Sequence, residues 1–417
     1  MKHRPIALMA AAAGAALIAS IGSFGQPQAN AATGATPGVT STEITVGATT
    51  PFAGPAAAYS QINEGTMAYF DYINAHGGVH GRKIHYIMLN DNYNPAQSVA
   101  DARQLVLQTG IFTMLGTLGT PTTYAEKPFL QQNGIGDILP ETGGYGVVVP
   151  RQPNWFAVEP NYTVEGEWDA QMAIKRFHAK KIAVWYQDDE FGQELLYGLE
   201  KGLAKAGMKP AITVPYEVTQ TNFTPNAQTM NSVHPDLVIT YGVPGTEAAY
   251  LAAQYKLGYH PTVLSTYVDN DSVMEALAGP AWNGVYTSGW LQDYWENTPA
   301  AKLFRTEVQK YYPKLQDYTF AEDGWVDGQI FVHALQLAGR HLTRQSLNKA
   351  MQSIHNYRNT LVLGPVNYSA SNHWGFDGLN LDRYVEKHGK WTMETLSKVI
   401  TLPNPYSVRN PSPPHLP

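Results

Sequence analysis

Apolar and polar residues alternate near the amino terminus in a pattern that switches between strand and helix spacing. A short apolar run around Ile44 predicts a buried strand, and the prolines and glycine of residues 51–55 end it in a loop. Residues 59–75 carry apolar side chains at helical spacing, and residues 83–89 alternate as a second strand. This order predicts a βαβ unit with a right-handed crossover. A ligand is then expected beyond the carboxyl ends of its strands, near the loop.

The same alternation continues after this unit. We expect a helix over 96–110, strands over 111–115 and 136–139, and a helix that runs toward Gln132 between these two strands. Both strand ends lead into segments rich in Thr and Gly, which would expose hydroxyl and backbone N–H groups in one crevice. Helix starts of this kind bind anions, but threonines there also act as helix caps and turn formers.

Strand and helix patterns repeat again in the second half of the chain. They include the strands 181–185, 235–242 and 263–266 with helices between them, and they predict a second doubly wound α/β lobe. A helix is expected over 321–337. Residues 403–417 contain six prolines and no periodic pattern, so we expect a disordered tail there.

Several of these segments resemble one protein family. Residues 44–54 read I-T-V-G-x-x-x-P-x-x-G, and residues 73–84 read I-N-A-x-G-G-V-x-G-R-K-I, with Asp91 after them. Residues 188–192 match D-x-x-[YF]-G at a strand end. The chain is therefore identified as similar to the leucine/isoleucine/valine-binding type of periplasmic binding protein, type I, the solute receptors of one class of ABC importer.

The resemblance implies an α/β fold of two doubly wound Rossmann-like lobes, joined by a hinge of three crossings, that close around a small solute. It also implies these divisions of the chain: a signal peptide at 1–31, a linker at 32–41, lobe one at 42–157 plus 289–360, lobe two at 158–288 plus 361–402, and the tail at 403–417. By matching position, the expected ligand contacts are Tyr59, Thr120, Thr122, Glu141, Thr142 and Gly143 from lobe one, and Phe191, Tyr241, Tyr267 and Asp269 from lobe two.

Two of these positions depart from the family pattern. Relatives that bind amino acids use a carboxylate of lobe two for the ligand ammonium, and Tyr267 stands at the matching position, with Asp269 close to it. Glu141 replaces a small residue beside the loop that binds a ligand carboxylate, where its negative charge would repel an anion. An amino acid, an aromatic acid, an amide or a polyol therefore all stay open as the ligand.

Composition restricts the other functions. The chain has no Cys, so it can form no disulfide, thiol nucleophile or lipoprotein anchor. Its net charge of −6 argues against nucleic-acid binding. The P-loop, G-x-S-x-G and H-E-x-x-H motifs are absent, so we expect no enzyme activity, no cofactor and no metal.

The start of the sequence predicts export. Lys2 and Arg4 precede an apolar run up to Ile21, and Ala29-Asn30-Ala31 supplies a small-residue cleavage pattern. We therefore expect an extracytoplasmic monomer that binds a solute and delivers it to the permease and ATPase subunits of an ABC importer. A receptor domain that senses a ligand and signals to a partner protein is the alternative, because fold alone does not settle function. An exported hydrolase is a third possibility.

Overall fold

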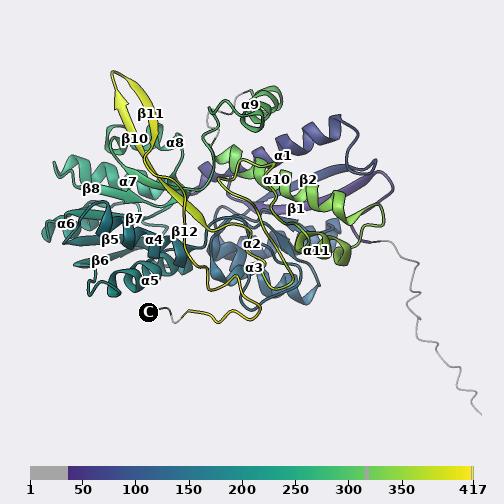
Figure 1. The fold of residues 1–417 in the computed structure, drawn as a ribbon, viewed down its shortest axis with the longest axis horizontal. Coiled ribbons are helices and arrows are strands. Elements are labelled where there is room, and N and C mark those ends of the chain that lie inside the picture. Colours follow the sequence, from purple (N-terminus) through teal and green to yellow (C-terminus); the bar gives the residue numbers. More distant parts are fainter. Residues whose placement is uncertain (1–35, 314, 316–318, 415, 417) are drawn as a thin grey trace, which may run out of the picture. The chain divides into compact units, whose positions relative to one another are not determined.

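Two sheets, each built from strand–helix repeats, organise the chain in the computed structural model (Figure 1). The structure describes residues 36–313, 315, 319–414 and 416. The predicted signal peptide and residues 32–35 of the predicted linker lie outside the described residues. The division into lobes stays a prediction.

The first sheet has four parallel strands in the order β2-β1-β3-β4. Its strands are β1 (Glu43–Thr50), β2 (Lys83–Asn90), β3 (Met114–Leu115) and β4 (Asp137–Ile138). The parallel pairing of β1 and β2 confirms the predicted βαβ unit. β3 and β4 are shorter than the strands predicted at 111–115 and 136–139, because their chains leave regular pairing within two residues.

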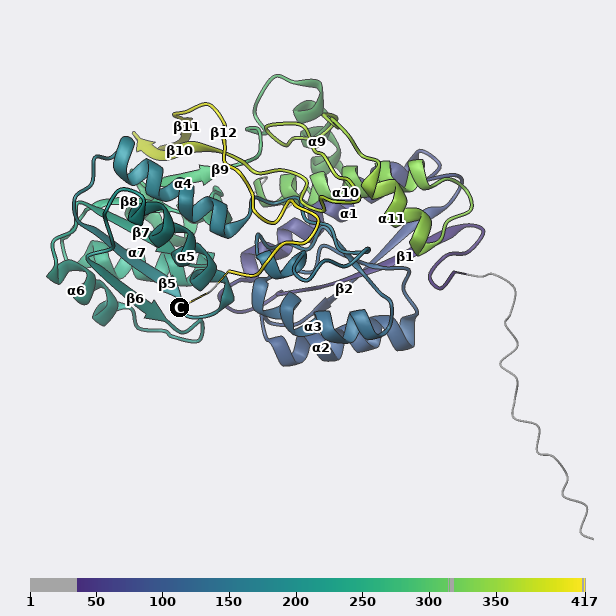
Figure 2. The same cartoon turned by 60° about the horizontal axis from the view of Figure 1, so that its bottom comes forward.

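Helices cover both faces of the first sheet. α1 (Ser60–Ala75) and α10 (Thr319–Ala338) lie on one face, and α2 (Pro95–Arg103) and α3 (Thr120–Gln132) lie on the other, as both views show (Figures 1 and 2). The chain after α2 continues as a π-helical segment, η2 (Gln104–Thr109), instead of one α-helix up to residue 110. The remaining elements of this part are η1 (Ala57–Tyr59), η3 (Tyr145–Val147), α9 (Pro299–Tyr311) and α11 (Arg344–Gln352).

α1 and α10 pack at very short range because each carries a glycine at the crossing. A Cβ atom on Gly65 would lie 1.9 Å from the carbonyl oxygen of Ala321, and one on Gly324 would lie 1.6 Å from that of Ile62. The Thr66 hydroxyl also donates to the Gly324 carbonyl oxygen at 2.9 Å. The crossing therefore fixes α10 against α1.

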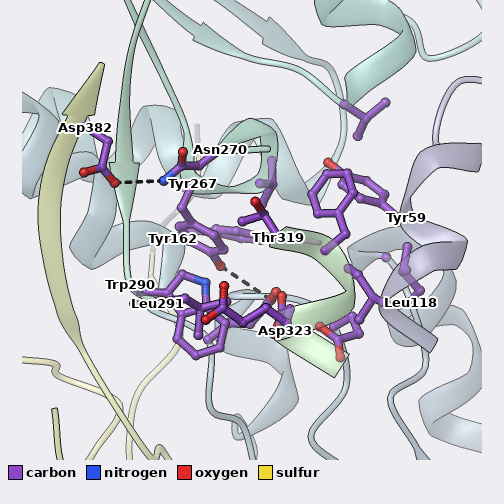
Figure 3. Close-up of a pocket in the computed structure, with 18 of the residues that line it drawn as sticks. Tyr59, Leu118, Tyr162, Tyr267, Asn270, Trp290, Leu291, Thr319, Asp323 and Asp382 are labelled. Atoms are coloured by element: carbon purple, nitrogen blue, oxygen red, sulfur yellow. Dashed lines mark hydrogen bonds between the residues drawn. The ribbon is translucent and has the colours of Figure 1, made fainter. Parts of the chain in front are cut away.

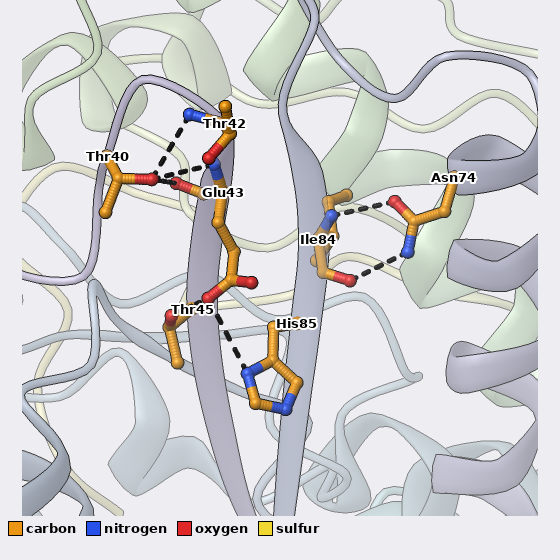
Figure 4. A network of polar contacts seen from close by, with 7 residues as sticks. All are labelled: Thr40, Thr42, Glu43, Thr45, Asn74, Ile84 and His85. Carbon is orange, nitrogen blue, oxygen red and sulfur yellow. Dashed lines mark hydrogen bonds and ion pairs between the residues drawn. The ribbon is translucent and has the colours of Figure 1, made fainter.

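Polar contacts fasten the start of the first sheet (Figure 4). The Asn74 side chain at the end of α1 donates to the carbonyl oxygen of Ile84 and accepts from its N–H, both at 2.8 Å. The Thr40 hydroxyl accepts from the N–H of Glu43 at 2.9 Å, at the first residue of β1. The Glu43 carboxylate lies 3.7 Å from the ring nitrogen Nδ1 of His85 on β2. These contacts hold α1 and the two strands in register.

The second sheet has strand order β11-β10-β9-β8-β7-β5-β6, and β12 pairs with β10. The strands from β6 to β9 are parallel, whereas β10 runs antiparallel to its neighbours. All five residues of β7 are buried, as expected for a parallel strand covered on both faces. The strands are β5 (Ile182–Gln187), β6 (Ile212–Tyr216), β7 (Leu237–Tyr241), β8 (Thr262–Ser265), β9 (Tyr286–Gly289), β10 (Gly378–Lys387), β11 (Lys390–Thr395) and β12 (Ile400–Thr401).

The helices of this part follow the predicted alternation. A second glycine pair brings two of them together: a Cβ atom on Gly166 would lie 2.2 Å from the Leu195 carbonyl oxygen, and one on Gly198 would lie 2.2 Å from that of Thr163. The helices are α4 (Tyr162–Lys175), α5 (Glu190–Ala204), α6 (Thr224–Ser232), α7 (Pro244–Lys256), α8 (Val273–Ala278), η4 (Tyr267–Asp269) and η5 (Gly279–Trp282).

The carboxyl-terminal residues differ from the expected disordered tail. Asn404 and Tyr406 are buried, and the Tyr406 ring stacks on that of Tyr145 with 5.5 Å between centroids. The Asn404 amide donates to the Asp377 carboxylate at 2.6 Å. The prolines end regular structure here, but an aromatic ring and an amide side chain still find partners.

Candidate functional site

A cavity lies where strand ends of the first sheet meet residues of the second sheet and the segments that connect them (Figure 3). Leu118 to Thr120 follow β3, Tyr162 opens α4, and Tyr267 begins η4. Trp290 and Leu291 follow β9 directly. In the view of Figure 3, Tyr59 and Leu118 lie at one end of the cavity and Tyr162, Tyr267 and Trp290 at the other. Its position agrees with the rule that ligands bind beyond the carboxyl ends of parallel strands.

Three carboxyl groups gather at this cavity from three separate parts of the chain. Glu141 follows β4, where its N–H donates to the Thr117 carbonyl oxygen at 2.8 Å and prolongs the parallel pairing of β3 and β4. Glu159 lies just before α4, and its carbonyl oxygen accepts from the Trp374 indole at 2.7 Å. Asp323 projects from the first turns of α10, beside the glycine crossing with α1.

These carboxyl groups are deeply buried: Glu141 and Asp323 are each 6% exposed and Glu159 is 5% exposed. Burial raises the pKa of Glu141 and Glu159 well above the ordinary range, and the charge of Asp323 raises both further. Burial also raises the pKa of Asp323 to about 8. Two carboxylates in contact cannot both ionise cheaply, so the group holds protons near neutral pH.

Little in the protein compensates these oxygens. Among the described residues, no N–H or hydroxyl group donates to either carboxyl oxygen of Glu141 or to Oδ1 of Asp323. Their close neighbours are other carboxyl groups, including that of Asp327. The Tyr267 hydroxyl oxygen lies 3.5 Å from the Glu159 carboxyl group, but its one proton is donated to the nearer Pro160 carbonyl oxygen at 2.9 Å. The oxygens of Glu141, Glu159 and Asp323 lie within 4.8 Å of one another, a spacing that could also hold a metal ion.

Aromatic rings form most of the remaining wall. The Tyr59 ring meets that of Phe320 edge-on with 5.0 Å between centroids. The Tyr162 ring meets Phe191 at 5.1 Å and stacks on Tyr267 at 6.0 Å. Such contacts hold each ring in one orientation and leave a surface suited to a flat or apolar group.

Five of the ten residues predicted to bind ligand line this cavity. The lining set comprises Tyr59, Thr120, Glu141, Phe191 and Tyr267. The Tyr59 hydroxyl is buried and without a hydrogen-bond partner among the described residues, whereas the Tyr267 hydroxyl donates to the Pro160 carbonyl oxygen at 2.9 Å. Their role as ligand contacts stays a prediction.

The other five lie behind the wall. The Tyr241 hydroxyl donates to the Asp169 carboxylate at 2.8 Å, and Asp269 is fully buried near Ser265. The Thr122 hydroxyl donates to the Gly119 carbonyl oxygen at 2.9 Å, within the first turn of α3. Thr142 shares a 2.8 Å hydrogen bond with Thr120, and the Gly143 carbonyl oxygen accepts from the N–H of Tyr162. Asp269 does not line the cavity, whereas Tyr267 does, and the role of both as ligand contacts stays a prediction.

Sequence reasoning missed Glu159, Tyr162, Trp290 and Asp323. Their segments carry no local motif for a ligand contact, and only tertiary packing brings them to the cavity. One signal was available for Asp323, because the predicted helix 321–337 begins with two consecutive acidic residues among apolar ones. Acidic side chains in a buried helix start are unusual without a partner or a ligand.

Within the described part of the chain, no helix is both long and apolar enough to span a membrane.

Comparison with known proteins places the chain in a family. The profile of the periplasmic binding protein family matches residues 43–382. A Leu/Ile/Val-binding protein homolog from Brucella melitensis is 27% identical over 238 residues, which cover 56% of this chain and 60% of that relative. The match thus spans less than two thirds of the relative's length.

Solved structures share the fold at low sequence identity. The fatty acid ABC transporter substrate-binding protein from Thermomonospora curvata has a TM-score of 0.78 and 20% identity, with 88% of this chain and 94% of that one covered. A solute-binding protein of an ABC transporter from R. palustris, in complex with benzoate, has a TM-score of 0.75 and 20% identity, with 88% and 99% covered. The family comprises solute-binding proteins and not enzymes, as the sequence predicted. The chain therefore belongs to the periplasmic binding protein family, with the type I fold that the sequence resemblance predicted.

Proposed function

We propose that this protein is the extracytoplasmic solute receptor of an ABC importer and that it captures a small organic solute in the cavity. The observation that carries the proposal is the origin of the lining residues, which come from the ends of both sheets and from the segments between them. A solute at this place contacts both halves of the protein at once. Its binding therefore favours a closed arrangement over an open one.

The solute has an apolar or ring-bearing part that lies against the aromatic wall. Amino acids and aromatic, carboxylate or amide compounds are the candidate classes from the sequence. The two solved relatives are described with fatty acid and with benzoate, so similar folds serve chemically different solutes. The lining side chains, and not the fold, decide among the classes.

The proposal also covers the location of the protein and its partner proteins. It acts outside the cytoplasm as a monomer, after removal of residues 1–31, and passes its solute to the permease and ATPase subunits of the importer. A receptor that signals to a partner protein would use the same cavity and differ only in that partner.

A melting-temperature screen of the purified protein against a solute library tests the proposal. A ligand at one hundred times its dissociation constant stabilises the folded state by about 2.7 kcal/mol, which such a screen detects. The shift given by a true ligand should disappear in Tyr59→Ala and persist in Tyr255→Ala, since Tyr255 is 44% exposed and lies outside the cavity. If no solute of any class raises the melting temperature, the proposed function is wrong.

A further inference from the structure

The charged residue types that line the cavity are all acidic. Six acidic residues line it, whereas no Lys, Arg or His lines it among the described residues. The acidic residues are Glu141, Glu159, Asp293, Glu322, Asp323 and Asp382. Where these groups ionise they attract cations and repel anions, and low-dielectric walls strengthen both effects. A bound cation favours that ionised form, whereas an anion opposes it.

Three of these acidic side chains, Glu141, Glu159 and Asp323, lie close together as one group. Both oxygens of Glu141 and one of Asp323 lack a donor among the described residues, although both side chains are 94% or more buried. A buried acceptor without a donor destabilises the folded protein, and more so when the group is charged. Asp382 differs, because it accepts from the Asn270 amide at 3.1 Å and from the Asn380 amide at 3.0 Å. Both oxygens of Glu322, which also lines the cavity, likewise lack a donor among the described residues. The group of three differs from Glu322 because its carboxyl oxygens lie within 4.8 Å of one another, so one bound donor can reach all of them.

The wall around the group also suits a cation. Tyr162, Tyr267 and Trp290 line the same cavity, and the Tyr267 hydroxyl touches the Glu159 carboxylate. Aromatic faces attract ammonium groups, and the attraction is stronger where water is excluded. Carboxylates and rings together form the kind of cage that binds organic ammonium ions.

We infer that the solute is an organic cation, an amine or quaternary ammonium compound without a carboxylate, whose charged group lies among Glu141, Glu159 and Asp323. The inference rests on the proposed function and narrows its solute class. An ammonium group offers N–H donors or a diffuse positive charge to the orphaned oxygens, and its organic part covers the rings. An added carboxylate would find no basic side chain in the lining and would face six acidic ones.

A bare divalent ion explains less of the site. The three carboxylates have a spacing that such an ion could use. However, it would need several oxygen ligands and would leave the aromatic wall without a partner. The organic cation uses both features, and the divalent ion is one of the outcomes that the experiment separates.

The experiment compares solutes that share a skeleton and differ in charge. Phenethylamine, phenylalanine, phenylacetate and 2-phenylethanol are titrated into the purified protein at pH 8 by calorimetry, beside larger amines and quaternary ammonium compounds with their matched acids and alcohols. CaCl₂, MgCl₂ and ZnCl₂ are titrated separately. Within each matched set we expect the amine to bind most tightly and the acid most weakly, by about tenfold or more.

Amide variants assign the charge to its residues. Glu141→Gln and Asp323→Asn keep the shape of each side chain and should weaken binding of the amine by about tenfold or more each. Glu217→Gln removes one exposed acidic charge of the second sheet region and should leave the affinity unchanged. The melting temperature of each variant without solute reports its folding, and the solute series on the unaltered protein decides the inference even if a variant fails to fold.

The outcomes separate the two proposals. Tighter binding of an acid, an amino acid or a neutral compound than of its matched amine overturns the inference and leaves the solute-receptor function standing. A divalent ion that binds more tightly than every amine overturns the inference as well. If no solute of any charge binds, the proposed function fails together with it.

Discussion

Glu141 combines a well-held backbone with a carboxyl group that lacks a hydrogen-bond donor. Its backbone pairs with the chain that follows β3, which positions the side chain at the cavity. Its carboxyl group has no donor among the described residues and meets the acidic side chains of Glu159 and Asp323 instead. Without a bound cation, the three carboxyl groups therefore keep protons, which a cation displaces when it binds.

Binding of a quaternary ammonium solute should strengthen as the pH rises from 5.5 to 8. Burial raises the pKa of Asp323 to about 8, and raises those of Glu141 and Glu159 well above the ordinary range, so a cation must displace protons at the lower pH. The affinity can rise by up to about tenfold per pH unit for each proton displaced. The solute keeps a fixed charge throughout.

Calorimetry at three pH values, in buffers with different heats of protonation, measures both the affinity and the protons released. Asp323→Asn should reduce both. An affinity that stays flat or falls toward pH 8 would contradict the prediction. Among the described residues, the other titratable groups that act on these carboxyls from the packed elements are acids and tyrosines: Glu322 and Asp327 on α10, Asp137 on β4, Tyr86 on β2, Tyr162 on α4 and Tyr267 on η4.

Most of the strands and helices could be predicted from the sequence, whereas part of the candidate site could not. The βαβ unit follows from local periodicity, and the helix 321–337 follows from the family resemblance. The β10–β11 hairpin was not predicted, although His388 and Gly389 form a two-residue turn with positive φ between two strands. The family resemblance predicts Tyr241 as a ligand contact, but Tyr241 does not line the cavity, and every residue of β7 is buried. The sequence pattern of a strand buried on both faces does not tell which face lies toward a ligand.

The partners of Glu141 could not be predicted for a different reason. Glu159 comes from a connecting segment, and Asp323 comes from a helix far along the chain that packs on α1 through glycine. No local pattern encodes that packing. Sequence reasoning therefore found Glu141 and its conflict with an anionic ligand, and it could not find the other two members of the group.

Replacing a glycine at the α1–α10 crossing should affect stability and binding together. In Gly324→Ala the new Cβ atom would lie 1.6 Å from the Ile62 carbonyl oxygen, so the helices must separate. We expect a loss of about 1–3 kcal/mol in the free energy of unfolding. Weaker solute binding should accompany it, because Phe320 and Asp323 move with α10.

Denaturant unfolding and calorimetry measure the two effects. Gln336→Ala on an exposed position of the same helix is the matched control and should change stability by no more than about 0.5 kcal/mol. A Gly324→Ala protein with unchanged stability would show that the crossing adapts without cost.

Buried carboxyl groups occur throughout the molecule and not only at the cavity. Burial raises the pKa of Asp137 and Asp377 to about 7, and that of Glu194 to about 8. Ion pairs that act in the opposite direction are few: Lys201 and Lys205 lower the pKa of the partly exposed Glu167. The balance of raised over lowered values decides how the whole protein responds to pH.

The protein without solute should be more stable at pH 5 than at pH 8. A carboxyl group whose pKa is higher in the folded than in the unfolded state keeps its proton longer when folded, so its contribution to stability is full below the unfolded value and is lost as the pH rises through the folded value. For Asp137, Asp323 and Glu194 this window runs from about pH 4 to pH 8. Melting temperatures at pH 5, 6.5 and 8 should therefore fall by at least about 3 °C in total.

Asp137→Asn removes one titrating group and should flatten the slope of melting temperature against pH, whatever it does to stability at a single pH. Glu217→Gln should leave the slope as it is. A melting temperature that rises toward pH 8 would mean that paired carboxylates, and not buried acids, dominate the pH response.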